Sequence, residues 1–399
     1  SSIKLLGEPR RICQLLHWFM PSSRCSSKSW TTPSTDTSET DEVAEIECAW
    51  TRGLVAQNLL PTDGSLVTGG QRHFAFGDRP PVSSQYEVRG AIGKGSFGKC
   101  CMATHRPSGR RCVVKHVAAS EAGEHYFDNF VKGGLWQLLL DVSCDSPHQS
   151  VCKYLDFFLG GDSLYIVMEP VCGPELLERV LRDPPLSKES IQHMMFQALS
   201  ALCHVHSKGI VHRDVKLENF RSRGEDPLSD LVLIDFGLAC FEHRKDKSIC
   251  GSPDYLAPDM FLGRDYGTQV DIWSLGVCLY VMLTMEFPIR ESVILQENAA
   301  GYREEVKQAL QASALHFAST QTVDVLKKLL LVDASQRPTA AECLRHCWFA
   351  AKEPRSTRTA KGDEAFLPSS PSLKWIRAMA STRSFTSPKN CLPWVCGAQ

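Results

Sequence analysis

Side chains with complementary chemistry lie within residues 212–237. Asp214 is a carboxylate that can accept a proton from a hydroxyl group, and Asn219 and Asp235 offer the hard oxygen ligands that Mg²⁺ prefers. Lys216 adds a positive charge two residues after Asp214. A base, metal-binding oxygens and a cation are the parts that phosphoryl transfer requires, because this reaction depends on positioning and charge stabilisation. The spacing therefore predicts phosphoryl transfer.

A glycine-rich segment lies upstream of these residues. Gly93, Gly95 and Gly98 follow the spacing Gly-x-Gly-x-x-Gly, which also occurs in dinucleotide-binding folds and in ordinary loops. A dinucleotide-binding fold would place a helix directly after the glycines, whereas residues 99–103 are typical of a strand and the next strand-like run contains Lys115. We therefore expect the backbone N–H groups of this segment to approach ATP phosphates and Lys115 to neutralise their charge.

Together these segments resemble the eukaryotic protein kinases of the Ser/Thr type, and most closely the calmodulin-dependent and calcium-dependent group. The matching segments, in the order typical of the family, are residues 93–98, 112–115, 212–219, 235–237, 251–259, 271–276 and 333–349. The resemblance implies a protein serine/threonine kinase that uses ATP and Mg²⁺. The printed sequence contains no Asp-x-Asp-x-Asp-Gly loop, so it does not support calcium sensing by EF-hands of its own.

The resemblance also implies the fold, which is α+β and bilobal over residues 86–349. Residues 86–168 would form a small β-rich lobe with one helix, residues 169–171 the hinge, and residues 172–349 a larger helical lobe. In that second lobe, residues 190–207 carry apolar side chains at the 3.6-residue spacing of an amphipathic helix.

The two flanking segments have the composition of disordered chain. Residues 1–80 mix Ser/Thr-rich and Gly-rich stretches, and residues 350–399 are rich in Ser, Pro and basic residues. The first 35 residues, basic and serine-rich, are alternatively similar to some N-terminal targeting segments. Residues 373–385 contain a tryptophan among basic residues, which indicates either a calmodulin-binding helix or solvated disorder.

The roles that the resemblance implies are carried over residue by residue. Asp214 would be the catalytic base, Lys216 would contact the γ-phosphate, and Ser252 would hydrogen-bond within the same cluster. Asn219 and Asp235 would hold Mg²⁺. The expected nucleotide contacts, with Met168 as the gatekeeper behind the adenine, are Gly93, Gly95, Phe97, Gly98, Lys115, Met168, Glu169, Val171 and Glu175.

Substrate preference is predicted from two acidic residues. Glu175 and Glu218 match positions that pair with basic residues upstream of the phosphorylated Ser or Thr, which predicts protein substrates of that kind. Glu175 is also a candidate for binding the ribose, and either residue is alternatively a solvated glutamate.

A regulatory site is predicted at Ser248, four residues before Ser252. A phosphate there could pair with Arg213, next to the catalytic Asp, and order the loop. Lys245 lies three residues upstream, so a kinase that prefers basic residues, this protein included, would recognise Ser248. The alternative is a solvated basic loop.

One departure from the family concerns the partner of Lys115. The family's helix glutamate is replaced by glycine in the pair Gly133 and Gly134, and two glycines also weaken a helix by about 1 kcal/mol each. Either Lys115 lacks this partner, or Glu124 or Asp128 reaches it through an altered helix.

Two further departures affect the adenine pocket and a structural ion pair. Arg221 stands where the family has leucine beneath the adenine, so either the strand shifts or the arginine extends outward, and Val113 narrows the pocket from above. Asp259 replaces the glutamate that pairs with Arg337. These departures leave open the alternative of a pseudokinase that binds nucleotide or acts as a scaffold.

Composition excludes other classes of protein. A net charge of −1 lacks the basic face expected of nucleic-acid binding. No stretch approaches the roughly 20 apolar residues of a membrane span. The 17 cysteines lack zinc-site spacing, and their odd number indicates reduced thiols in a cytoplasmic protein.

Overall fold

The computed structural model of this protein describes residues 81–95, 98–122, 124–127, 130–131, 133–182, 186–226, 228–244, 247–290 and 299–350. Several predictions from the sequence concern residues outside these ranges. They are the disorder of residues 1–80 and 351–399, the targeting segment, the calmodulin-binding segment and the nucleotide contact of Phe97.

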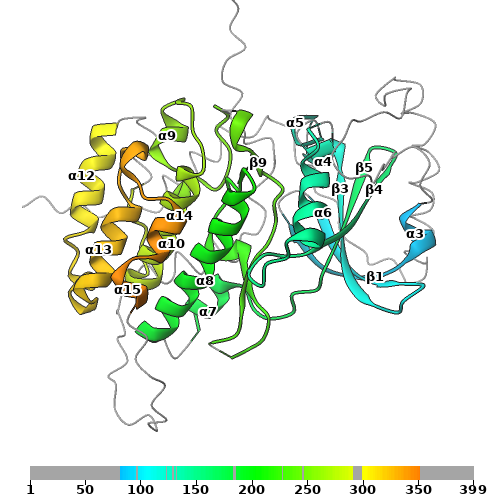
Figure 1. Ribbon diagram of the computed structural model, residues 1–399, viewed down its shortest axis with the longest axis horizontal. Helices are drawn as coiled ribbons and strands as arrows, with labels where there is room; N and C mark the ends of the chain where they lie inside the picture. The colour runs from blue at the N-terminus through cyan, green and yellow to red at the C-terminus, as the bar shows by residue number, and fades with distance from the viewer. Residues whose placement is uncertain are drawn as a thin grey trace, which may run out of the picture. The chain divides into compact units, whose positions relative to one another are not determined.

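Five antiparallel strands form one sheet, in the order β1-β2-β3-β5-β4 (Figure 1). They are β1 (Tyr86–Gly95), β2 (Gly98–His105), β3 (Arg111–Ala118), β4 (Tyr154–Gly160) and β5 (Ser163–Met168). The strand expected at residues 99–103 is confirmed, because it lies within β2. Strand β3 is central, and Lys115 lies opposite Cys100 of β2 and Ile166 of β5. The β-branched run around Lys115 suits a buried central strand.

Gly98 begins β2 at a point where this strand passes very close to β3. A Cβ at this position would lie 1.8 Å from the carbonyl oxygen of His116, far inside van der Waals contact. Only glycine therefore fits here, and the packing of the sheet itself requires one of the three glycines of the motif.

The single helix expected in this lobe is divided into pieces. Two single turns, α4 (Ala119–Ala122) and α5 (Glu124–Phe127), precede the longer α6 (Leu135–Asp145), which packs on β4. Gly134 caps α6 with φ +76° and ψ 12°, a left-handed conformation that cannot continue a right-handed helix. The interruption thus coincides with the glycine pair. A further turn, α3 (Val82–Gln85), precedes β1.

The second lobe is helical, as predicted. Its helices are α7 (Leu176–Val180), α8 (Lys188–Ser207), α9 (Pro258–Phe261), α10 (Gln269–Thr284), α12 (Ala299–Ala309), α13 (Thr320–Leu329), α14 (Ala340–Leu344) and α15 (Cys347–Ala350). The apolar stripe predicted for residues 190–207 is confirmed, since its members on α8 are all buried. Helix α10 is buried along nearly its whole length and packs on α8 and α13.

Short strands and 3₁₀ turns connect these helices and carry the predicted chemistry. The strands are β6 (Ile210–Val211), β7 (Phe220–Ser222), β8 (Leu231–Leu233) and β9 (Cys240–Phe241), and the turns are η3 (Leu217–Asn219), η4 (Glu242–Arg244), η5 (Pro253–Tyr255), η6 (Ser313–Phe317) and η7 (Ala334–Gln336). β6 pairs with β9 and β7 with β8, both antiparallel. These pairings bring residues 212–219 alongside residues 234–239.

One hydrophobic core joins the sheet to the helical lobe. It runs from Phe157 and Leu139 beneath the sheet into α8 and α10, where Trp273 is fully buried. A smaller cluster that includes Tyr86 and Phe158 covers the opposite face of the sheet. Because apolar contacts are continuous between the lobes, groups from both can be held at fixed distances across the site.

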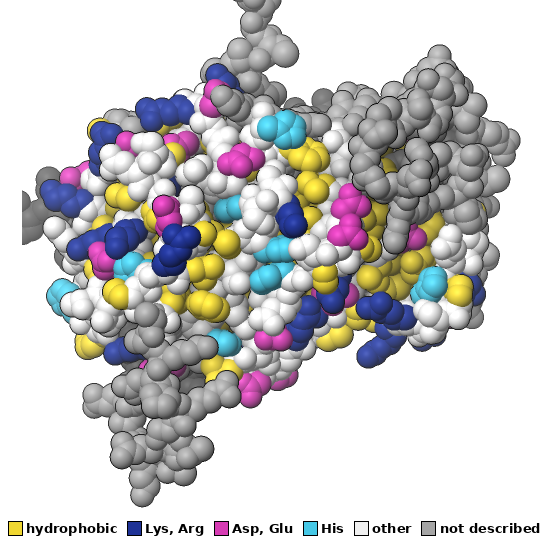
Figure 2. Space-filling model, viewed as in Figure 1, with side chains coloured by type: hydrophobic (Ala, Val, Ile, Leu, Met, Phe, Trp, Pro, Cys, Tyr) yellow, Lys and Arg dark blue, Asp and Glu magenta, His cyan; other side chains and the backbone are white. Residues whose placement is uncertain are grey.

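The distribution of charged side chains on the visible surface and the state of the described cysteines can be compared with the net charge and the cysteine count of the sequence. Figure 2 shows Lys and Arg side chains interspersed with Asp and Glu side chains on the visible face. Each cysteine that the structure describes is a free thiol, and about half of them are buried. None of the described helices is long and apolar enough to cross a membrane.

Candidate active site

The backbone just before Asp214 is hydrogen-bonded to a buried carboxylate near the start of α10. The two oxygens of Asp271 accept the backbone N–H groups of His212 and Arg213, each at 2.8 Å, and Oδ2 lies 2.9 Å from Nε2 of His206. Burial by itself raises the pKa of Asp271, but these hydrogen bonds and the neighbouring histidines hold that pKa below its usual value. The catalytic segment is thus anchored from below, by a residue whose role the sequence did not reveal.

Asp214, Lys216 and Ser252 form one hydrogen-bonded group, here called the Asp214 cluster. Lys216 Nζ lies 2.8 Å from Asp214 Oδ2 and donates to Ser252 Oγ at 2.8 Å, while Ser252 Oγ donates to Asp214 Oδ1 at 2.9 Å. Burial lowers the pKa of Lys216, but the charges of Asp214 and Glu218 raise it above its ordinary value, so the ammonium stays charged. Ser252 makes the hydrogen bonds that were expected of it.

Asn219 and Asp235, which the sequence predicts to bind the metal, lie beside this cluster. Asn219 Nδ2 donates to the backbone O and to Oδ2 of Asp214, at 2.7 and 3.0 Å, so the amide nitrogen faces the cluster. Ile234 N donates to Asn219 O at 2.9 Å, which brings the following residue, Asp235, alongside. An amide oxygen and a carboxylate fit Mg²⁺. No group of three or more His, Cys, Asp or Glu side chains suited to a metal occurs among the described residues.

Lys115 reaches Asp235 rather than open solvent. Its Nζ lies 2.6 Å from Asp235 Oδ1, and Lys115 is 4% exposed. Burial raises the pKa of Asp235, but the charge and hydrogen bond of Lys115 outweigh it and hold that pKa below its usual value. The cation expected at the phosphates is therefore paired with the carboxylate expected at the metal. The side chains of Glu124 and Asp128, the alternative partners of Lys115, lie outside the described part of the structure.

The glycine-rich segment forms the end of the β1–β2 hairpin. Gly93 lies opposite Cys100 and Gly95 opposite Gly98. Since Cys100 in turn lies opposite Lys115 on β3, the hairpin and the lysine belong to one continuous part of the sheet.

The hinge is held by an arginine that the sequence analysis missed. Glu169 donates its N–H to Lys153 O at 2.9 Å, so its carbonyl is the group that it offers to an adenine. Its carboxylate accepts hydrogen bonds from both terminal nitrogens of Arg223, at 2.9 and 3.1 Å, and from the backbone N–H of Lys153 at 3.1 Å. The neighbouring expected contacts, Met168 and Val171, are partly buried. Arg223 lies 54 residues from Glu169 in the chain, so no local pattern signals the pair.

Of the two alternatives predicted for Arg221, the strand shift does not occur, and the arginine stays partly buried with its terminal nitrogens turned toward Glu175 and Gly173. Its Nη1 lies 3.2 Å from Glu175 Oε1, and its Nη2 donates to Gly173 O at 2.8 Å. The side chain is 30% exposed, and β7 keeps its regular pairing with β8. Two guanidinium nitrogens are thus paired with a carboxylate and a carbonyl, whereas Nε is buried and has no hydrogen-bond partner among the described residues. The strand itself has not shifted.

Arg213 contacts the predicted regulatory serine. Its Nη1 lies 3.1 Å from Ser248 Oγ and 3.1 Å from Tyr266 OH, and its Nε donates to Leu238 O at 2.6 Å. Tyr266 OH donates to Ser248 O at 2.7 Å. Tyr266 was not anticipated, whereas the proximity of Arg213 and Ser248 was. Lys245 lies outside the described residues.

The shortened ion pair between Asp259 and Arg337 forms, as predicted. The Nη2–Oδ2 distance is 2.5 Å, and the two side chains are 5% and 0% exposed. The guanidinium also lies over the ring of Trp273, 5.2 Å from its centroid.

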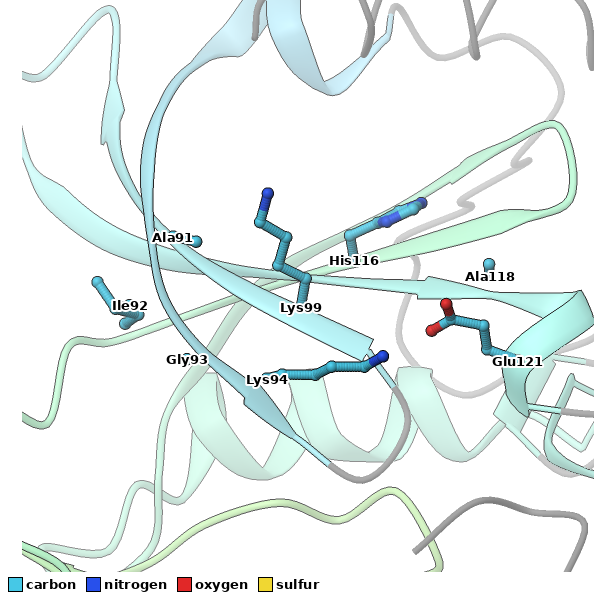
Figure 3. A pocket seen from close by; sticks show the side chains of 8 residues that line it. All are labelled: Ala91, Ile92, Gly93, Lys94, Lys99, His116, Ala118 and Glu121. Atoms are coloured by element: carbon cyan, nitrogen blue, oxygen red, sulfur yellow. The ribbon is translucent and has the colours of Figure 1, made fainter. Parts of the chain in front are cut away.

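A separate pocket of 660 Å³ lies on the other face of the sheet (Figure 3). Lys99 and His116, which line it, lie opposite each other on β2 and β3. This pair is next to the pair Cys100 and Lys115 along the two strands. Successive side chains of a strand point to opposite faces, so this pocket and Lys115 lie on different sides of the sheet.

Comparisons with known proteins agree with this geometry. A family model described as protein kinase domain matches residues 86–349. A calcium/calmodulin-dependent protein kinase type I from Schizosaccharomyces pombe is 31% identical over 312 residues, which are 75% of this chain and 89% of the relative. CDPK-related kinase 1 from Arabidopsis thaliana is 32% identical over 284 residues, 69% of this chain and 48% of the relative. A probable myosin light chain kinase from Dictyostelium discoideum is 28% identical over 279 residues, 67% of each chain. This chain thus spans about half the length of the plant relative.

Proposed function

Because this chain belongs to the protein kinase family, near the calcium/calmodulin group, we propose that it transfers the γ-phosphoryl group of ATP to Ser or Thr hydroxyls. Its substrates are proteins with basic residues upstream of the acceptor, and Mg²⁺ is the metal. The observation that carries the proposal is the Asp214 cluster, with Asn219 and Asp235 beside it. Groups from three separate segments converge there in the arrangement that phosphoryl transfer needs.

In this proposal Asp214 accepts the proton of the acceptor hydroxyl. Lys216 contacts Oδ2 of Asp214 and Ser252 donates to Oδ1, so both carboxylate oxygens are fixed in place before the substrate arrives. Lys216 remains positive and lies next to the base, where it stabilises the charge of the phosphoryl group in transit. The burial of Asp214 and Lys216 excludes water from both.

Asn219 and Asp235 are the residues that would hold Mg²⁺, and Lys115 the one that would bind the α- and β-phosphates. When bound, Mg²⁺ neutralises charge on the phosphates. Lys115 and Asp235 now satisfy each other, so nucleotide binding has to exchange this ion pair for contacts of Lys115 with phosphate and of Asp235 with metal.

One observation favours a second candidate function, a pseudokinase that binds nucleotide or serves as a scaffold. Helix α6 begins only after Gly134, and Lys115 is paired with the proposed metal ligand. A site that stays in this state would bind nucleotide poorly and would not align it for transfer.

Phosphate transfer from Mg-ATP to an Arg-x-x-Ser peptide separates the two functions. An active kinase loses transfer in Asp214→Asn by about 10²- to 10⁴-fold, the usual contribution of a general base, with an unchanged melting temperature. Absence of transfer by protein phosphorylated on Ser248 would instead favour the pseudokinase. Protection by Mg-ATP against thermal unfolding then tells a nucleotide-binding pseudokinase from a scaffold.

Calmodulin binding through residues 373–385 and a cytoplasmic location stay predictions. The yeast relative is named as calmodulin-dependent, and the predicted segment contains Trp375. Calcium-dependent binding of calmodulin that is lost in Trp375→Ala is the expected result, and no calcium-dependent binding would contradict it.

A further inference from the structure

Two glutamates lie near the Asp214 cluster and have different surroundings. Glu175 directly precedes α7, Glu218 belongs to η3, and these two elements pack on one another. Burial raises the pKa of Glu218, the charge of Lys216 opposes this rise, and the charges of Asp214 and Glu175 add to it, so the two glutamates lie within electrostatic range of each other. Without other partners, two such carboxylates would form a single anionic site for a basic side chain.

Glu175 is already occupied from within the chain. Arg221 Nη1 lies 3.2 Å from Glu175 Oε1, and Arg221 Nη2 is tied to Gly173 O at 2.8 Å. The backbones of the two residues form an antiparallel bridge, and Ser222 N donates to Pro174 O at 2.9 Å next to it. Because backbone pairing holds the partners opposite each other, the ion pair is built into the fold rather than being a chance surface contact.

Glu218 differs from Glu175 in its hydrogen-bond partners. Its Oε2 is buried and has no hydrogen-bond partner within the described part of the chain. It lies between Lys216 and Asn219 in the sequence, next to the place where the acceptor hydroxyl is expected. A buried carboxylate oxygen without a donor is costly, and a cationic side chain arriving with the substrate would satisfy it.

We propose that Arg221 determines substrate specificity by occupying Glu175, so that the basic residue of a protein substrate is bound by Glu218 alone. The inference rests on the proposed function, because it concerns the substrates of that reaction. It follows that replacing Arg221 by an apolar residue restores a site of two carboxylates and strengthens the preference for a basic residue.

The experiment compares two acceptor peptides, Arg-x-x-Ser and the same peptide with alanine for arginine. The ratio of their kcat/KM values is measured for the wild type, Arg221→Leu, Glu175→Gln, the double variant of these two, and Glu218→Gln. Effects on ATP binding cancel in this ratio. Arg223→Leu is the matched control, because that arginine lies two residues further along and pairs with Glu169 instead.

The ratio in the wild type should fall about tenfold in Glu218→Gln, as expected for one charge-assisted contact, and should be unchanged in Glu175→Gln and Arg223→Leu. In Arg221→Leu it should rise about tenfold, and Glu175→Gln should then reverse the rise. An unchanged ratio in Arg221→Leu, or a loss in the single variant Glu175→Gln equal to that in Glu218→Gln, overturns the proposal. Fluorescence anisotropy measures the ratio of the two peptides' Kd values without any transfer, and the same changes are expected in it, so failure of the kinase activity is distinguished from failure of this inference.

Discussion

Lys115 and Asp235 are 120 residues apart in the chain, and their side chains form an ion pair with an Nζ–Oδ1 distance of 2.6 Å. One residue is the proposed phosphate ligand and the other the proposed metal ligand. In this structure the two side chains contact each other, and in the proposed function binding of Mg-ATP would change the partners of both. The strength of this pair thus influences both the stability of the protein without nucleotide and its affinity for nucleotide.

Lys115→Met should lower the free energy of unfolding without nucleotide by about 1–3 kcal/mol, because it leaves the carboxylate of Asp235 without the cation that contacts it. The variant should also be protected less by Mg-ATP against thermal unfolding. Urea unfolding measures the first effect and thermal shift the second. Lys99→Met, on the other face of the sheet, is the control and should change neither. A variant at position 115 as stable as the wild type would show that the ion pair contributes nothing.

The buried carboxyl of Glu218 should make stability depend on pH. Burial raises its pKa in the folded protein, so its contribution to stability is complete below the unfolded pKa of about 4.3 and is lost as pH rises through the higher folded pKa. Glu218→Gln should therefore melt at a higher temperature than the wild type at pH 7, by about 2–4 °C for each kcal/mol, and the difference should vanish near pH 4. Thermal unfolding from pH 4 to 8 tests this, with exposed Glu87→Gln as the control. Equal melting temperatures at pH 7 would refute it.

Phosphorylation of Ser248 should increase activity through Arg213. The guanidinium nitrogen already lies 3.1 Å from the serine hydroxyl, so a phosphate there gains a charge-assisted hydrogen bond without a large movement. Phosphorylated protein should transfer phosphate about tenfold faster than unphosphorylated protein, and the two forms of Arg213→Gln should be equally active. Tyr266→Phe keeps the guanidinium and should retain the activation. Mass spectrometry showing Ser248 unmodified in fully active protein would contradict the prediction.

Gly134→Ala should destabilise the protein by about 1–2 kcal/mol, because a residue with a Cβ is strained at φ +76°. A Cβ there would meet no atom within 4 Å, so the cost is conformational rather than a clash. Gly90→Ala is the matched control, since its Cβ also meets nothing within 4 Å and its backbone is not left-handed. Chemical unfolding compares the two variants. Equal effects would show that the helix interruption does not depend on this conformation.

Strands and helices near the site were predicted well where the sequence pattern that indicates them is local. The strand at residues 99–103 and the stripe on α8 are confirmed, because periods of two and of 3.6 residues are properties of a short segment. The glycine pair correctly indicated a weakened helix. That α4, α5 and α6 would be separate pieces was not predicted, because a propensity does not specify where a helix resumes.

The anchoring groups around the site were predicted poorly. Asp271 was identified only as part of a segment, residues 271–276, that resembles the family, and neither its two backbone hydrogen bonds nor its contact with His206 could be inferred. Tyr266 and Arg223 were missed for the same reason. Each acts on a residue brought close by folding, and single side chains of ordinary type leave no signature of such a partner.

The sequence by itself determined the chemistry predicted for this protein, because Asp214, Lys216 and Asn219 lie within a few residues of one another and their types and spacing indicate a base, a cation and a metal ligand. Tertiary structure decided which charges meet. Lys115 pairs with Asp235, Arg221 with Glu175 and Arg223 with Glu169. A long cationic side chain can reach any of several acids, and only the packing of strands and helices around the core settles which carboxylate lies within hydrogen-bond distance. Among the described residues that packing leaves Oε2 of Glu218 without a hydrogen-bond donor.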